Sequence, residues 1–82
     1  MRSNPFFDAA NAIVATYEDR IQYMNPKRTV RELPRATLAL EHLADAARYA
    51  GRTKTSDAIA EAAKYWEHYG KKPALFTEDT TA

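Results

Sequence analysis

The sequence predicts an all-α fold, a small three-helix bundle with short connectors and a partly disordered C-terminal tail. Apolar residues recur at steps of three and four along three segments, which is the period of an amphipathic helix. Both glycines, Gly51 and Gly70, stand where an alanine-rich pattern stops, and glycine readily adopts the left-handed conformation that closes a helix. The predicted single domain spans 1–76, with helices at about 5–24, 34–50 and 56–69 and a flexible tail at 77–82.

The first predicted helix begins with residues suited to a helix start. Asn4 is a suitable N-cap, Pro5 fits the first helical position, and Asp8 complements the N-terminal dipole. Pro26 ends the helix, because the residue before a proline is displaced from the right-handed helical region. Asn11 is expected on the polar side. The predicted apolar stripe is Phe6, Ala10, Ile13, Tyr17, Ile21 and Met24.

The second predicted helix begins near Pro34. The stretch Thr29–Glu32 matches a capping box, but a helix starting there would place Pro34 at its fifth position and delete the hydrogen bond to Val30. We therefore expect a short turn before Pro34 and the helix end just before Gly51. The predicted inner stripe is Leu33, Ala36, Leu40, Leu43, Ala47 and Ala50.

The third predicted helix begins at Thr55 or Ser56, either of which can act as the N-cap, with Asp57 in the first turn. Gly70 closes this helix. The apolar group Ala74–Phe76 that follows is expected to dock on the bundle. The predicted inner side consists of Ile59, Ala62, Ala63, Trp66 and Tyr69.

The bulk composition is typical of a small globular protein. Of the 82 residues, 45% are hydrophobic and 28% are charged, and cysteine is absent, which excludes disulfides and thiolate metal sites. The longest apolar run, Ala12–Ala15, is far shorter than the roughly 20 residues that span a bilayer. We expect a cytoplasmic protein without membrane contact.

No catalytic, cofactor or metal site is predicted. Nucleophilic catalysis needs an activated hydroxyl or thiol beside a base, and capping explains the two serines, Ser3 and Ser56, at predicted helix starts. His42 and His68 have no second histidine or carboxylate cluster at metal-ligand spacing. We therefore expect no enzymatic activity and no cofactor.

The second predicted helix carries further apolar residues on its outer side. At about 100° per residue, Leu38 and Tyr49 point away from the inner stripe, with His42 beside them. Tyrosine and arginine are enriched in binding hot spots, which favours an interface with a protein partner or a second copy. The alternative is that Leu75 and Phe76 of the tail cover this side. The predicted interface residues are Arg31, Arg35, Leu38, His42 and Tyr49.

Positive charge is concentrated in the middle of the chain. Between Lys27 and Lys54 there are seven basic residues and three acidic ones, although the formal net charge of the whole chain is only +1. Such a basic centre favours contact with phosphate groups. The candidate anion or nucleic-acid contacts are Lys27, Arg28, Arg52 and Lys54.

These features favour a non-enzymatic protein-interaction module, a small regulator or inhibitor that binds another macromolecule and self-associates through the second helix. The alternative is a small DNA-binding transcriptional regulator, because Ala47–Gly51 with Ile59 resembles a helix-turn-helix. The spacing from the glycine to the next core residue is two longer than that motif usually allows. Asp57 and Glu61, at the start of the second helix of the motif, would also repel DNA.

Overall fold

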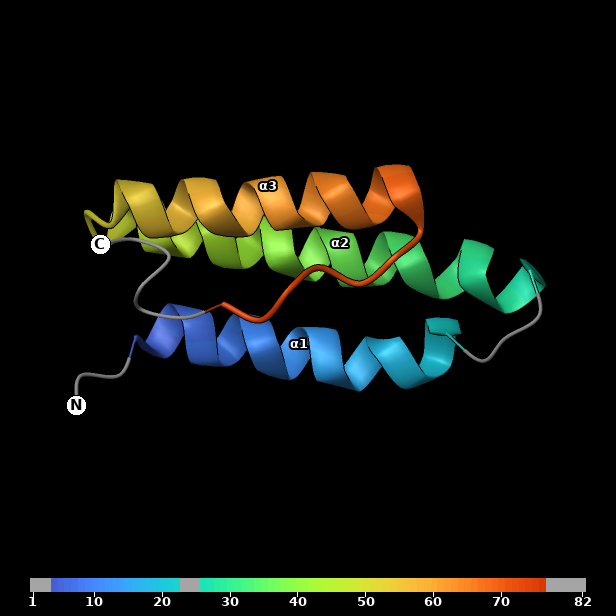
Figure 1. Cartoon of the computed structure of the whole chain (residues 1–82). Coiled ribbons are helices and arrows are strands. Elements are labelled where there is room, and N and C mark those ends of the chain that lie inside the picture. The colour runs from blue at the N-terminus through green and yellow to red at the C-terminus, as the bar shows by residue number, and fades with distance from the viewer. Residues whose placement is uncertain (1–3, 23–25, 77–82) are drawn as a thin grey trace.

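Three helices and no strand make up the part of the chain that the computed structural model describes, residues 4–22 and 26–76, with side chains at 4–17 and 32–76. The all-α prediction is therefore confirmed. The helices lie side by side along the longest dimension of a 38 × 23 × 17 Å molecule (Figure 1). They are α1 (Pro5–Gln22), α2 (Pro26–Tyr49) and α3 (Thr53–Tyr69).

The start of α1 is capped as predicted. The Asn4 side-chain oxygen accepts hydrogen bonds from the main-chain N–H groups of Phe6 and Phe7, at 3.0 and 3.2 Å. The Asn4 amide also donates to the Thr55 hydroxyl at 3.3 Å, which joins the start of α1 to the first turn of α3. The helix is described as far as Gln22, and its predicted end at Met24 lies outside the described residues.

The predicted start of the second helix is wrong, because α2 begins at Pro26 rather than near Pro34. Pro26 occupies the first helical position, where a missing N–H costs nothing. Pro34 then lies inside the helix and removes one main-chain hydrogen bond. Packing of Ala36 and Leu40, both fully buried, stabilises the helix despite that loss, so the stretch Thr29–Glu32 is helical and not a capping box.

Gly51 turns the chain from α2 into α3. It has a positive φ of 81°, its N–H donates to the Arg48 carbonyl at 3.0 Å, and the Arg52 N–H donates to the Ala47 carbonyl at 2.9 Å. This pair of bonds is a Schellman motif, which satisfies carbonyl groups left free at a helix end. The predicted role of Gly51 as a helix-closing residue therefore matches its geometry.

The predicted N-cap of the third helix is wrong. Arg52 stands at the cap of α3 without a side-chain capping bond, and Thr55 and Ser56 are buried inside the helix. Because the Schellman motif has already ordered the chain at Arg52, the helix begins at Thr53 without a capping hydroxyl. Gly70 ends α3 as predicted, with φ of 68° and its N–H bonded to the Trp66 carbonyl at 2.8 Å.

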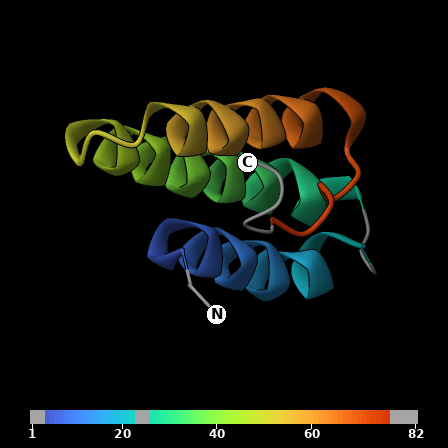
Figure 2. The ribbon, with the colours of Figure 1, turned by 60° about the vertical axis from the view of Figure 1, so that its left-hand side comes forward.

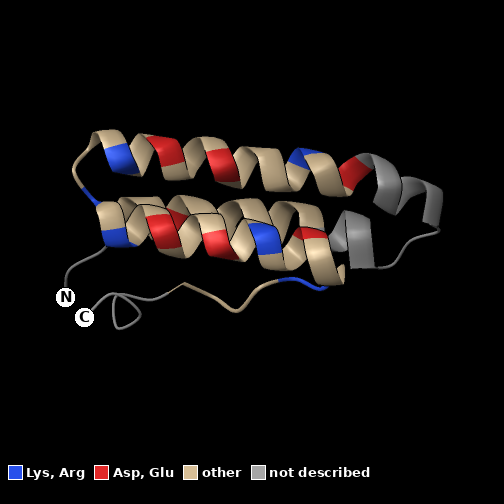
Figure 3. Cartoon of the chain, turned by 90° about the horizontal axis from the view of Figure 1, so that it is seen from above, with Lys and Arg blue, Asp and Glu red and all other residues tan. Residues whose placement is uncertain are grey.

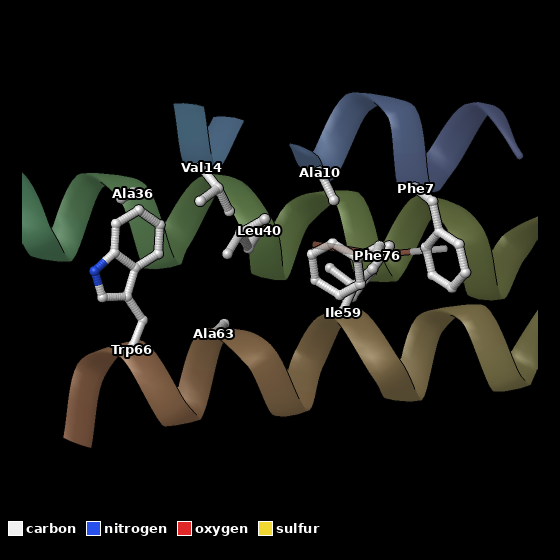
Figure 4. Close-up of a cluster of buried hydrophobic side chains, with 10 residues drawn as sticks. Phe7, Ala10, Val14, Ala36, Leu40, Ile59, Ala63, Trp66 and Phe76 are labelled. Atoms are coloured by element: carbon white, nitrogen blue, oxygen red, sulfur yellow. The ribbon is translucent and has the colours of Figure 1, made fainter. Parts of the chain in front are cut away.

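The core lies between the three helices, with α2 packed against both α1 and α3, which contact each other much less. Trp66 is almost completely buried, and the small side chains of Ala36 and Ala63 beside it leave room for its indole (Figure 4). The buried hydrophobic cluster is Phe7, Ala10, Val14, Ala36, Leu40, Ala44, Ile59, Ala63, Trp66 and Phe76.

Three details of the predicted stripes are wrong. Ala50, predicted on the inner stripe of the second helix, is exposed and lies in the turn after α2, which ends at Tyr49. On α1 the buried positions are Phe7, Ala10 and Val14, so the inner face is rotated away from Phe6, which is only half-buried. Tyr69 on α3 is 60% exposed and does not face the core. The main chain after α3 returns along the side left open between α1 and α3 (Figures 1 and 2), and Phe76 of this segment joins the buried cluster.

The segment after α3 docks on the bundle as predicted. Pro73 and Phe76 are buried, whereas Ala74 and Leu75 are exposed. The Phe76 ring stacks on Phe7 of α1, with the ring centroids 5.3 Å apart and the planes at 22°. Phe76 therefore acts as a fourth source of core packing. The predicted flexible tail, 77–82, lies outside the described residues.

Candidate functional site

The outer face of α2 is exposed. Leu38 is 51% exposed and Tyr49 is 94% exposed, which leaves two large apolar side chains facing water. Arg35 and His42, the other predicted interface residues with described side chains, are exposed on the same helix. Arg31 also lies on α2, but its side chain is outside the described residues.

The alternative that Leu75 and Phe76 cover this face does not hold. Phe76 packs against Phe7 of α1, and Leu75 borders a groove on α3. Within the described chain, the outer face of α2 is therefore uncovered. Its apolar groups are not continuous, since Leu38 and Tyr49 are about 16 Å apart along the helix axis.

The four candidate anion contacts do not form one patch. Lys27 and Arg28 lie at the start of α2, whereas Arg52 and Lys54 follow its end, and a 24-residue helix is about 36 Å long. The Arg52 guanidinium lies over the ring of Phe6 at 6.0 Å, where it makes a cation–π contact with α1. Lys27 and Arg28 are therefore separated from Arg52 and Lys54 by the length of α2.

Charges of both signs are interspersed along the described parts of α2 and α3 (Figure 3). On α3, Lys54 and Lys64 are outnumbered by Asp57, Glu61 and Glu67, all exposed. The two helices also run antiparallel side by side, whereas the helices of a helix-turn-helix meet at about 90–120° (Figure 1). Neither feature favours α3 as a helix that reads DNA.

The two histidines lie on different helices, and of the two serines Ser56 is described whereas Ser3 lies outside the described residues. His42 is exposed on α2, and His68 is exposed on α3, where its ring meets the edge of Tyr69 at 4.6 Å. Ser56 is 1% exposed, so a substrate cannot reach its hydroxyl. In the chain as described, no three histidine, aspartate or glutamate side chains come close enough together to hold a metal ion.

A groove between α3 and the returning segment was not foreseen from the sequence. It is open to solvent and has a volume of about 480 Å³. Leu75 is 72% exposed and Tyr65 is 44% exposed at its borders, and Tyr65 packs against Tyr69 at 4.8 Å. The lining residues are Ala58, Glu61, Ala62, Tyr65, Pro73, Ala74, Leu75 and Phe76.

Asn11 holds the returning segment beside this groove, although the sequence placed it on the polar side of its helix. Its amide nitrogen donates to the Phe76 carbonyl at 3.0 Å, and its amide oxygen accepts from the Phe76 N–H at 2.9 Å. The sequence did contain one signal for this role of Asn11. Asn11 follows Ala10, so its polar side chain lies at the edge of the buried stripe of α1.

The described molecule thus presents two apolar surfaces, the outer face of α2 and the groove beside α3. None of its described helices combines the length and apolar character needed to cross a bilayer. Comparisons of the chain with protein-family models, with curated proteins and with solved structures found no match.

Proposed function

We propose that this chain is a non-enzymatic protein-interaction module, a small regulator or inhibitor that binds a partner protein or a second copy of itself through the outer face of α2. The observation that carries the proposal is the exposure of Leu38 and Tyr49 on a helix whose opposite side fills the core. When a partner covers large apolar and aromatic groups that stay in water after folding, their burial lowers the free energy and favours binding.

The neighbouring side chains of this face support a protein partner. Arg35 and His42 offer hydrogen-bond donors beside Leu38, and Asp45 offers an acceptor. This mixture of an apolar anchor with polar groups around it is typical of the rim and centre of a protein interface. A surface of mixed charge also suits a protein better than it suits a nucleic-acid backbone, which attracts a predominantly basic surface.

The absence of enzymatic activity is part of the proposal. Its support is the burial of Ser56 and the separation of the exposed histidines, His42 on α2 and His68 on α3. Nucleophilic and general acid–base catalysis both need side chains placed within hydrogen-bond reach of one another and of a substrate.

The test is capture of proteins from a lysate of the organism that encodes the chain, using wild type, Leu38→Glu and Ala15→Glu as immobilised baits. Ala15 is an exposed alanine on α1, so its variant carries the same added charge on a different face. We expect mass spectrometry to find a partner that both wild type and Ala15→Glu retain and that Leu38→Glu loses. Equal capture by all three baits would contradict the role of the α2 face.

A further inference from the structure

The outer face of α2 carries four exposed side chains in one line. Their positions along the chain differ by steps of four, three and four, so at about 100° per residue all four lie within about 60° of one another around the helix. This is the spacing of the contact seam of a helix pair, in which two positions of every seven face the partner helix. We call this line the α2 seam, and its residues are Leu38, His42, Asp45 and Tyr49.

The α2 seam is complementary to itself when its direction is reversed. Leu38 and Tyr49 stand at its two ends, and His42 and Asp45 stand between them at equal distances from its midpoint. If a second α2 lies antiparallel about a two-fold axis at this midpoint, Leu38 faces the partner's Tyr49. His42 then faces the partner's Asp45, and an imidazole N–H can donate to that carboxylate. The two-fold axis makes each of these contacts occur twice.

A second pair of opposite charges lies on one edge of the α2 seam. Glu41 and Arg48 are both exposed, and both lie about 70–90° from the seam on the same side. In the antiparallel pair this edge faces the same edge of the partner, and Glu41 comes within about 3 Å of the partner's Arg48 along the helix axis. The opposite edge carries the small side chains of Ala39 and Ala46, which let the helices approach closely. Within the part of the chain that the structure describes, the side chains of Glu41 and Arg48 form no ion pair.

Other arrangements of two α2 helices bring like charges together. In a parallel pair each seam residue faces its own copy, so Asp45 would lie against the partner's Asp45. An antiparallel pair shifted by one heptad toward the start of α2 would put Glu41 beside the partner's Glu41. The opposite shift would put Arg48 beside the partner's Arg48. Because like charges that meet across an interface are unfavourable, the charges of this face favour one orientation and one register.

We propose that the partner of the outer face of α2 is a second copy of this chain, bound as an antiparallel helix pair in which Leu38 contacts the partner's Tyr49 and His42 contacts the partner's Asp45. The ion pair between Glu41 and the partner's Arg48 fixes the orientation. The interface spans about three helical turns per chain, so the dimer is weak and forms at high protein concentration. This inference rests on the proposed function, because it names the occupant of the surface on which that function depends.

The first test exchanges the two flanking charges and measures the dissociation constant of the dimer by sedimentation equilibrium. Glu41→Arg and Arg48→Glu each place like charges side by side at two symmetric points, so each should weaken self-association about tenfold. The double variant restores opposite charges and should associate within about twofold of wild type. Glu67→Arg, the same charge change at an exposed position of α3, should leave the constant unchanged. A double variant that associates no better than the single variants, with all of them folded by circular dichroism, would overturn the proposal.

The second test reports the orientation of the helix pair, and it uses the absence of cysteine from the chain. A short thiol cross-linker should join Leu38→Cys to Tyr49→Cys when the two variants are mixed, because these positions face each other in the antiparallel pair. Either variant alone should give no cross-link, since two copies of one position then lie about 16 Å apart along the axis. Cross-linking of either variant to itself, or none in the mixture, would overturn the proposal.

These results separate failure of the helix pair from failure of the proposed function. A wild type that stays monomeric at every concentration would overturn the helix pair, whereas loss of a lysate partner by Leu38→Glu would still support the proposed function. Equal capture from the lysate by all baits would contradict binding of another protein through α2. Association that the charge exchange restores would still support the helix pair in that case.

Discussion

At the scale of single residues, Trp66 makes the largest individual contribution to the core. Its side chain is 1% exposed, and the neighbouring positions Ala36 and Ala63 are 0% exposed, so the large indole fills space that small side chains leave. Interiors are packed as densely as crystals of small organic molecules, and a removed side chain leaves a cavity that the backbone cannot close.

Trp66→Ala should therefore lower the free energy of unfolding by about 3–5 kcal/mol, which is most of the stability that a domain of this size has. Urea denaturation followed by circular dichroism measures the change. Tyr69→Ala is the control, because this aromatic residue of the same helix is 60% exposed and its loss should cost no more than about 0.5 kcal/mol. Equal effects of the two substitutions would show that Trp66 is not a core residue.

Two asparagines show which residue-level contacts a sequence can predict. Asn4 was identified as an N-cap because its partners, Phe6 and Phe7, are its close neighbours in the chain. Asn11 was missed because its partner, Phe76, is 65 residues away, and only the tertiary fold brings the two together. Local hydrogen bonds follow from residue type and spacing, whereas distant ones depend on how the helices pack.

At the scale of elements, the ends of α2 and α3 were easier to predict than their starts. Gly51 and Gly70 both have positive φ, a conformation that strongly favours glycine. A glycine after a helical pattern therefore indicates where the helix ends. The starts of α2 and α3 depend on packing and on the preceding turn, which is why Pro34 and Ser56 misled the prediction. Pro34 removes one main-chain hydrogen bond from the helix, and the burial of apolar side chains on the inner face of α2 outweighs this loss.

Pro34→Ala should stabilise the protein. The substitution restores an N–H that can donate to the Val30 carbonyl, and it removes a residue that destabilises a helix interior by about 3 kcal/mol. The greater conformational freedom of the unfolded chain offsets up to about 1 kcal/mol of this gain. A net gain of about 2 kcal/mol should raise the thermal midpoint measured by circular dichroism. Pro34 is exposed, so the change leaves no cavity. A lower midpoint would indicate that α2 needs a proline bend to pack.

At the scale of the whole molecule, the sequence predicted the exposed face of α2 but not the groove beside α3. Helical period alone places Leu38 and Tyr49 opposite the buried stripe, and both are exposed. The groove requires Leu75 and Pro73 to return against Tyr65, an arrangement that no periodicity within one helix contains.

The central claim is that α2 fills the core with one side and binds a protein, including a second copy, with the other. Sedimentation velocity of wild type, Leu38→Glu and Ala15→Glu over a range of concentrations tests it most directly. Wild type and Ala15→Glu should sediment as dimers at high concentration, and Leu38→Glu as a monomer with the same helical circular dichroism spectrum. A wild type that stays monomeric at every concentration, or a Leu38→Glu that still pairs, would contradict self-association through this face.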